Sequence, residues 1–191
     1  MTKSALVPAR RQFFRRAGQA TLSATAVALL AGCASAMGKD EKAAMAAKSS
    51  DIDILNSARG AEFNAIAAYQ VGAESGLLQK PVLAVAVQFQ GHHKLHADAL
   101  GRAIESLGGT PVEPKAKYDF PVDRLKSQAD VLNFAAGLEK DAVSAYLNAV
   151  PLFGNRDLAK AAASILGDEA MHWAVLRNAL GQDPVPVAFM S

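Results

Sequence analysis

Two glutamates stand where a helix of a soluble protein ordinarily carries apolar residues. Glu62 lies in the middle of an apolar stripe with helical spacing, and Glu139 lies in the middle of a second such stripe. An ionised glutamate is rarely buried unless it is paired or bound to metal. A glutamate repeated on two core faces therefore predicts a compensating cation. The plainer alternative is that both faces are rotated outward and that both side chains lie in water.

Further polar groups recur three residues apart on two other helical segments. Glu169 and His172 have this spacing, and so do His93 and His96, so each pair projects from one side of its helix. Carboxylate and imidazole ligands suit iron or manganese, and zinc would also bind. One glutamate from each of two helices and a Glu-x-x-His pair from each of the other two is a known arrangement for a two-metal site. Glu169 and His172 match this pair, whereas His93 stands at the glutamate position of the other. The predicted ligands of two metal ions, with iron preferred, are Glu62, His93, His96, Glu139, Glu169 and His172.

The histidines leave other interpretations open. Gln90 and His93 could face the site in place of His93 and His96, although only the second choice preserves the internal repeat described below. His96 and His172 could also be core side chains bonded to the backbone or to tyrosine. His92 is expected to be a partly exposed neighbour and not a ligand.

The segments that carry these side chains form an internal repeat. Residues 55–69 align with residues 132–146, and more than half of the positions are identical. The segments that follow them align as well, with His96 matching His172. We therefore expect two copies of a helical hairpin, related by a pseudo-two-fold axis that brings equivalent side chains together.

Turn signals divide the chain into helices joined by a short, a long and a short connection. The long connection, residues 108–126, contains three prolines. Ser50 and Asp53 form a capping pair that predicts the start of the first helix near Asp51. The expected helices cover about 51–75, 81–107, 127–153 and 157–180. This pattern predicts an all-α four-helix bundle with one long crossover.

The motifs of these helices resemble the ferritin-like superfamily, in its exported branch related to rubrerythrin and bacterioferritin. The resemblance rests on Glu62 to Tyr69, Glu139 to Tyr146, and Glu169-x-x-His172. It implies a di-iron centre with ferroxidase, peroxidase or other oxidoreductase activity, and oxygen or peroxide as a partner. Tyr69 and Tyr146 are candidates for a catalytic redox role, or are core aromatics with satisfied hydroxyls. The family pattern expects a glutamate at the position of His93, which leaves one negative charge fewer around the metals.

The N-terminal segment resembles an export signal. Arg10-Arg11 followed by Phe13-Phe14 resembles a twin-arginine motif, and the residues up to Cys33 resemble a lipoprotein processing box. The resemblance implies cleavage before Cys33, lipidation of Cys33 and a periplasmic or cell-surface lipoprotein. The expected divisions are a signal peptide over 1–32, a flexible tether over 33–50, the bundle over 51–181 and an irregular tail over 182–191.

The charge distribution argues against one class of partner. The chain has 20 basic and 18 acidic residues, and five of the basic ones precede Cys33, which leaves 15 against 18. A mildly acidic body gives no electrostatic reason to bind nucleic acid. Three hypotheses for the function remain. The protein is an oxidoreductase, or a non-catalytic lipoprotein that buffers metal or binds a partner, or a bundle whose polar core is satisfied without metal. A tethered protein suits a monomer or a small homo-oligomer.

Overall fold

The computed structural model describes residues 34–190, with side chains from residue 38 onward. The described chain contains four α-helices: α1 (Ala34–Glu74), α2 (Lys80–Ser106), α3 (Gln128–Ala149) and α4 (Arg156–Ala179). Two short 3₁₀ turns, η2 (Val122–Arg124) and η3 (Val150–Leu152), lie in the connections. The predicted all-α fold is confirmed. Cys33 and the proposed export signal lie outside the described residues.

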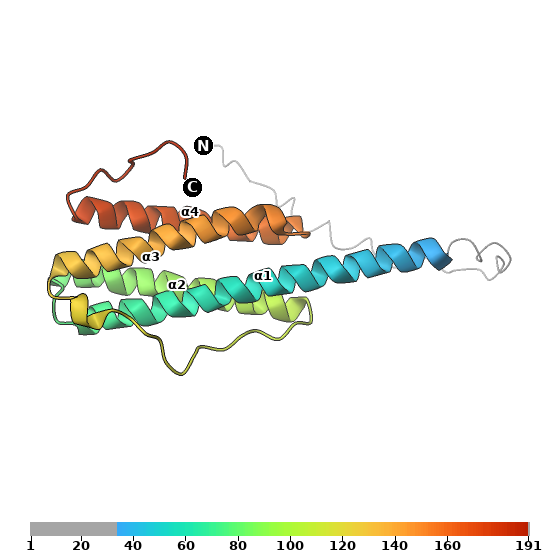
Figure 1. Cartoon of the computed structure of the whole chain (residues 1–191), viewed down its shortest axis with the longest axis horizontal. Coiled ribbons are helices and arrows are strands. Elements are labelled where there is room, and N and C mark those ends of the chain that lie inside the picture. The colour runs from blue at the N-terminus through green and yellow to red at the C-terminus, as the bar shows by residue number, and fades with distance from the viewer. Residues whose placement is uncertain (1–33, 191) are drawn as a thin grey trace, which may run out of the picture. The chain divides into compact units, whose positions relative to one another are not determined.

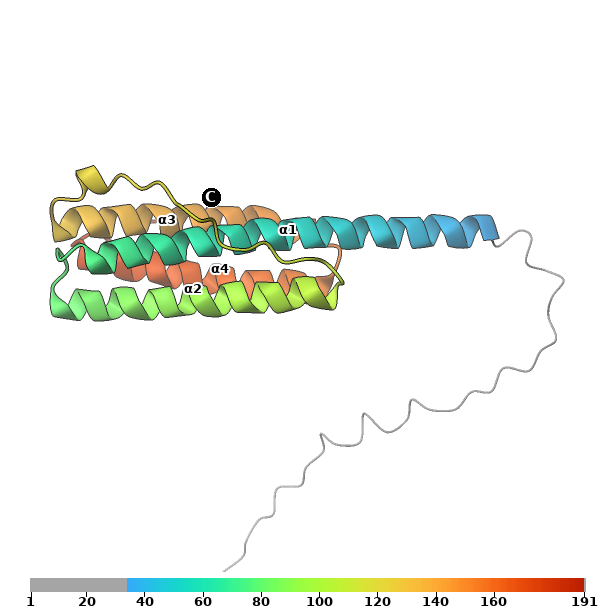
Figure 2. The same ribbon diagram turned by 90° about the horizontal axis from the view of Figure 1, so that it is seen from below.

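The chain from Asp40 onward packs as one compact unit, and it is a four-helix bundle. Figures 1 and 2 show that α1 and α4 run in one direction and that α2 and α3 run in the other. The connection between α2 and α3 returns along the length of the bundle (Figure 1). This is the predicted long crossover, and it lets two hairpins, α1–α2 and α3–α4, face each other.

Local signals fix most helix ends. Ser127 and Asn155 precede α3 and α4, and the side-chain oxygen of each accepts a hydrogen bond from a backbone N–H of the first turn. Gly108 and Gly181 follow α2 and α4 with φ of 73° and 70°. A residue with a side chain rarely adopts this conformation, so glycine ends these helices at little cost.

The predicted start of α1 is wrong. The helix begins at Ala34, so most of the segment expected to be a flexible tether is helical. Residues 40–50 are all exposed, so packing does not hold this stretch in a helix. Alanine and lysine make up more than half of it, and both have high intrinsic helix propensity. Asp51 therefore lies within the helix and is not at its end.

Apolar residues fill the bundle on both sides of a central polar layer. One cluster contains Leu55, Leu100, Ile104, Tyr146, Ala162 and Ile165. The other contains Tyr69, Phe89, Leu132, Ala136, Trp173 and Leu176. Each helix contributes to both clusters, and its site residues lie between its two contributions along the sequence. The polar layer is therefore enclosed by apolar side chains at both ends.

Within residues 34–190, no helix is both long enough and apolar enough to cross a membrane.

Candidate metal centre

All four helices deliver polar side chains to the centre of the bundle. Five of these residues are 2% exposed or less: Glu62, His93, Glu139, Glu169 and His172. His96 lies beside them and its side chain is 14% exposed. The structure thus brings together the six residues that the sequence singled out, and the alternative that the two glutamates face water is wrong.

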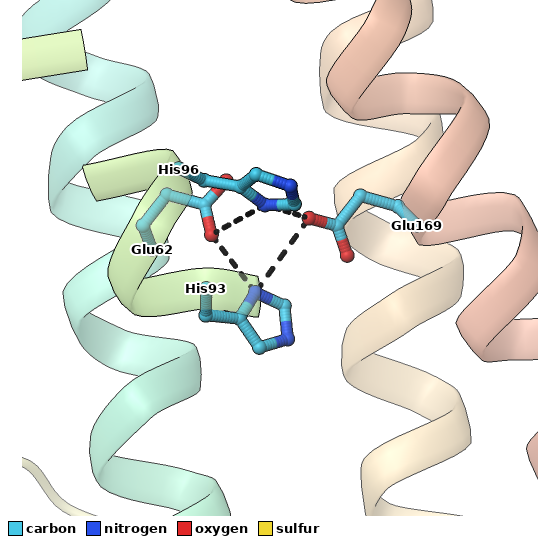
Figure 3. A group of neighbouring side chains, drawn as sticks. All are labelled: Glu62, His93, His96 and Glu169. Carbon is cyan, nitrogen blue, oxygen red and sulfur yellow. Dashed lines mark hydrogen bonds and ion pairs between the residues drawn. The ribbon is translucent and has the colours of Figure 1, made fainter. Parts of the chain in front are cut away.

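Four of the six surround one position between α1, α2 and α4 (Figure 3). His93 Nδ1 lies 2.8 Å from Glu62 Oε2, and His96 Nδ1 lies 3.1 Å from Glu169 Oε1. The two remaining contacts, His93 Nδ1 to Glu169 Oε1 and His96 Nδ1 to Glu62 Oε2, are both 3.6 Å. Ligand atoms about 2.0–2.2 Å from one metal ion lie about this far from one another.

A second position lies between α2, α3 and α4. His93 Nε2 is 3.3 Å from Glu139 Oε1, while His172 Nδ1 is 3.4 Å from Glu169 Oε2 and 3.6 Å from Glu139 Oε2. Glu169 therefore offers one oxygen to each position. His93 likewise offers one ring nitrogen to each, at the place where the family resemblance expects a carboxylate.

The hydrogen bonding of these side chains fits bound cations. Among the described residues, five buried side-chain atoms lack a hydrogen-bond partner: His96 Nδ1, Glu139 Oε2, Glu169 Oε1, Glu169 Oε2 and His172 Nδ1. All five face the two positions. An unsatisfied buried polar atom is costly, by roughly 1–3 kcal/mol. Metal ions at the two positions would satisfy all five.

Without metal, protons balance the charge of the cluster. Burial alone would lower the pKa of His93, but hydrogen bonds to Glu139 and Glu62 raise it to about 10. Burial lowers the pKa of His96 and His172 as well, but the carboxylates that face them outweigh this effect and raise both pKa values to about 9.

The three glutamates differ in their pKa values. Burial opposes the ionisation of Glu139, but the facing imidazoles of His172 and His93 hold its pKa well below the usual range. Histidines outweigh burial at Glu62 as well, and its pKa is lowered. At Glu169 burial prevails and raises the pKa. The group that faces both positions is thus the carboxylate that most readily keeps a proton when metal is absent.

The two tyrosines connect the hairpins by hydrogen bonds. Tyr69 of α1 donates its hydroxyl hydrogen to Glu139 Oε1, and Tyr146 of α3 donates to Glu62 Oε1 at 2.6 Å. Burial and the neighbouring carboxylates raise the pKa of both hydroxyls above the usual range. Each tyrosine therefore orients the glutamate of the other hairpin and stays protonated.

Sequence reasoning missed Asp168 altogether. Its Oδ2 lies 3.3 Å from Nε2 of both His96 and His172, whose Nδ1 atoms face the two positions. It also lies 3.0 Å from Nδ1 of His92, which is half-buried and not one of the six. A carboxylate on the far nitrogen orients a ligating histidine. The only sequence signal for this role was the position of Asp168 immediately before the predicted ligand Glu169.

Gln90 does not face the cluster. Its Nε2 donates to the Ile66 carbonyl at 3.0 Å and to Gln70 Oε1 at 2.8 Å, and its Oε1 accepts from Lys94. The pairing of Gln90 with His93 as site residues is therefore not the arrangement of this helix.

A groove reaches the cluster from the side of α1 and α3. It has a volume of about 610 Å³, and its inner wall includes Glu62, His93 and Glu139. Asp53 and Asp141 also line it, whereas lysine and arginine are absent from the lining that the structure describes. Such a groove admits small molecules and attracts cations.

Comparison with known proteins places this site in context. The sequence profile of the ferritin-like domain matches residues 50–182. No relative matches among curated proteins. A conserved hypothetical protein from Mycobacterium tuberculosis is similar in structure, with 24% identity and a TM-score of 0.65 over 75% of this chain and 99% of that one.

Two other solved structures are also similar. A ferritin-like, diiron-carboxylate protein from Bacillus anthracis shares 20% identity with a TM-score of 0.61, over 70% of this chain and 97% of that one. A dodecameric thioferritin related to bacterioferritin, from Bacteroides fragilis, shares 26% identity with a TM-score of 0.61, over 70% of this chain and 86% of that one.

Proposed function

Because the chain belongs to the ferritin-like domain family, we propose that it binds two divalent metal ions, with iron preferred, and uses them in oxidation–reduction chemistry. One observation supports this most strongly. The five unpartnered buried atoms of the described chain all converge on the two positions between the hairpins. The similar protein from Bacillus anthracis is a diiron-carboxylate protein, which is in line with the proposal.

The residues around the two positions would have different roles. Glu62 and His96 would hold one ion, Glu139 and His172 would hold the other, and Glu169 and His93 would offer ligand atoms to both. Bound iron would supply the electrons that reduce dioxygen or peroxide. The groove between α1 and α3 gives these small oxidants, and ferrous iron as a substrate, a path to the site. Tyr69 and Tyr146 orient the two glutamates by hydrogen bonds. Their closeness to the metal positions is the only structural support for a redox role.

Metal content tests the proposal directly. The two positions should hold about two metal ions per chain in purified protein, and the double change Glu62→Gln and Glu139→Gln should remove both, since it removes both charges without changing side-chain volume. Elemental analysis by mass spectrometry measures it. The exposed Glu74→Gln and Glu105→Gln pair is the matched control and should keep its metal. Equal metal content in both double variants would end the proposal.

A non-catalytic metal buffer is the second candidate, and His93 favours it. Three carboxylates and three imidazoles neutralise two cations less fully than a set with one more carboxylate, and this disfavours the more highly charged oxidised state. Oxygen or peroxide consumption on addition of ferrous iron separates the candidates. Consumption in proportion to iron supports an enzyme, whereas uptake of iron without consumption supports a buffer.

We further propose that the protein acts outside the cytoplasm as a lipoprotein. This location is supported by the twin-arginine-like motif, Arg10-Arg11 with Phe13-Phe14, and by the lipoprotein-like residues up to Cys33. The twin-arginine route carries folded proteins, so metal can be loaded before export. The relative from Bacteroides fragilis is a dodecamer, and for this chain we propose a monomer or a small oligomer.

A further inference from the structure

Three polar atoms meet on the α2 and α4 side of the bundle, outside the two positions described above. His92 Nδ1 lies 2.9 Å from His172 Nε2 and 3.0 Å from Asp168 Oδ2. His172 Nε2 lies 3.3 Å from Asp168 Oδ2. His92 and Asp168 occupy equivalent positions in the two hairpins, 76 residues apart. The same hairpin symmetry that builds the centre therefore also builds this triangle.

Hydrogen atoms alone do not satisfy such a triangle when the carboxyl group is ionised. If both ring nitrogens donate to Asp168, two N–H groups face each other across 2.9 Å. If only one nitrogen carries a hydrogen, the lone pair of the other nitrogen faces the carboxylate oxygen. At least one edge therefore joins atoms of like polarity. A cation ~2.1 Å from all three atoms fits above a triangle of these edges and makes every contact favourable.

We propose that His92, Asp168 and His172 form a third cation-binding position. Two imidazoles and one carboxylate suit Fe²⁺, Zn²⁺ or Co²⁺, with the remaining coordination positions open. The side chains of His92 and Asp168 are 34% and 22% exposed, so water can fill those open positions. Phe89 stacks on the ring of His172 with 3.9 Å between centroids and holds both of its nitrogens in place.

His172 joins this outer position to the centre. Its Nδ1 faces Glu139 and Glu169, and its Nε2 faces His92 and Asp168. This coupling rests on the proposed two-metal function.

Zn²⁺ is the probe, because it has no redox chemistry and prefers imidazole and carboxylate. Calorimetric titration and elemental analysis of the purified protein should give three Zn²⁺ per chain, and His92→Ala should give two. Gln88→Ala, one turn earlier on α2 and exposed, is the matched control and should keep three.

The outcomes separate this position from the centre. Glu62→Gln with Glu139→Gln should keep one Zn²⁺, and His92→Ala in that background should remove it. A wild type that binds one Zn²⁺, lost in His92→Ala, would support the outer position while the two-metal proposal fails. Equal Zn²⁺ content in His92→Ala and the wild type would overturn the outer position. So would a crystal grown with Zn²⁺ in which anomalous scattering shows no peak beside His92 and His172.

Discussion

Protons and metal ions compete for the same atoms at the level of single residues. In the metal-free protein, His96 and His172 hold protons up to about pH 9, and His93 up to about pH 10, because carboxylates face them. Metal binds only the neutral imidazole. Each ion that enters the centre therefore displaces protons from these histidines, and the apparent metal affinity rises with pH.

The stability of the metal-free protein should depend on pH in a defined direction. The three histidine pKa values are raised above the ordinary 6.5, so their contribution is complete below about pH 6.5 and is lost as pH rises through 9 to 10. The midpoint of thermal unfolding in chelator should fall over this range. Protein saturated with Zn²⁺ should not show this fall, because its imidazoles are already neutral. A flat midpoint in chelator would contradict the assigned ion pairs.

Asp51 connects two elements that are far apart in the sequence. It lies within α1, is 3% exposed, and accepts hydrogen bonds from the backbone N–H groups of Gly154 and Asn155 at 2.8 and 3.0 Å. These two residues form the turn between α3 and α4. One carboxylate therefore fixes the first helix of one hairpin to the turn of the other.

Removal of this carboxylate should loosen the contact between the hairpins. Asp51→Ala should lower the free energy of unfolding by about 1–3 kcal/mol, because two backbone donors lose a charged acceptor. Urea unfolding followed by circular dichroism measures the loss. Asp53→Ala, two residues away on an exposed part of the same helix, is the control and should change stability by less than about 0.5 kcal/mol. Equal losses in the two variants would remove the special role of Asp51.

Sequence patterns predict the elements well where the signal is local. Ser127 caps α3, glycines follow three of the helices, and the repeat brings the six polar residues to one layer. The start of α1 escapes prediction because an exposed alanine-rich stretch shows no apolar stripe, although it has helix propensity. Asp51 stands at the predicted helix start, and its true partners, 103 and 104 residues away, leave no local trace. The contacts of Asp168 depend on helix rotation, which spacing alone does not fix.

For the whole molecule, the proposed anchor lies outside the bundle. The proposed attachment is an acyl group at Cys33. Arg10→Lys with Arg11→Lys should keep the protein in the cytoplasm, since the paired arginines are the proposed export signal. Cys33→Ser should instead yield exported protein in the soluble fraction. Cell fractionation with immunoblotting measures both, and export of the double lysine variant would contradict the twin-arginine assignment.

The crossed tyrosine bonds have a consequence for the origin of the chain. Each hairpin keeps the hydroxyl that aligns the carboxylate of its counterpart, so half of the polypeptide is incomplete by itself. A single ancestral hairpin would have needed an identical copy to finish its own pocket. Fusion of two copies in tandem makes that pairing permanent, and it frees one copy to diverge. His93 opposite Glu169 is such a divergence, at the place where strict symmetry would demand two of the same residue.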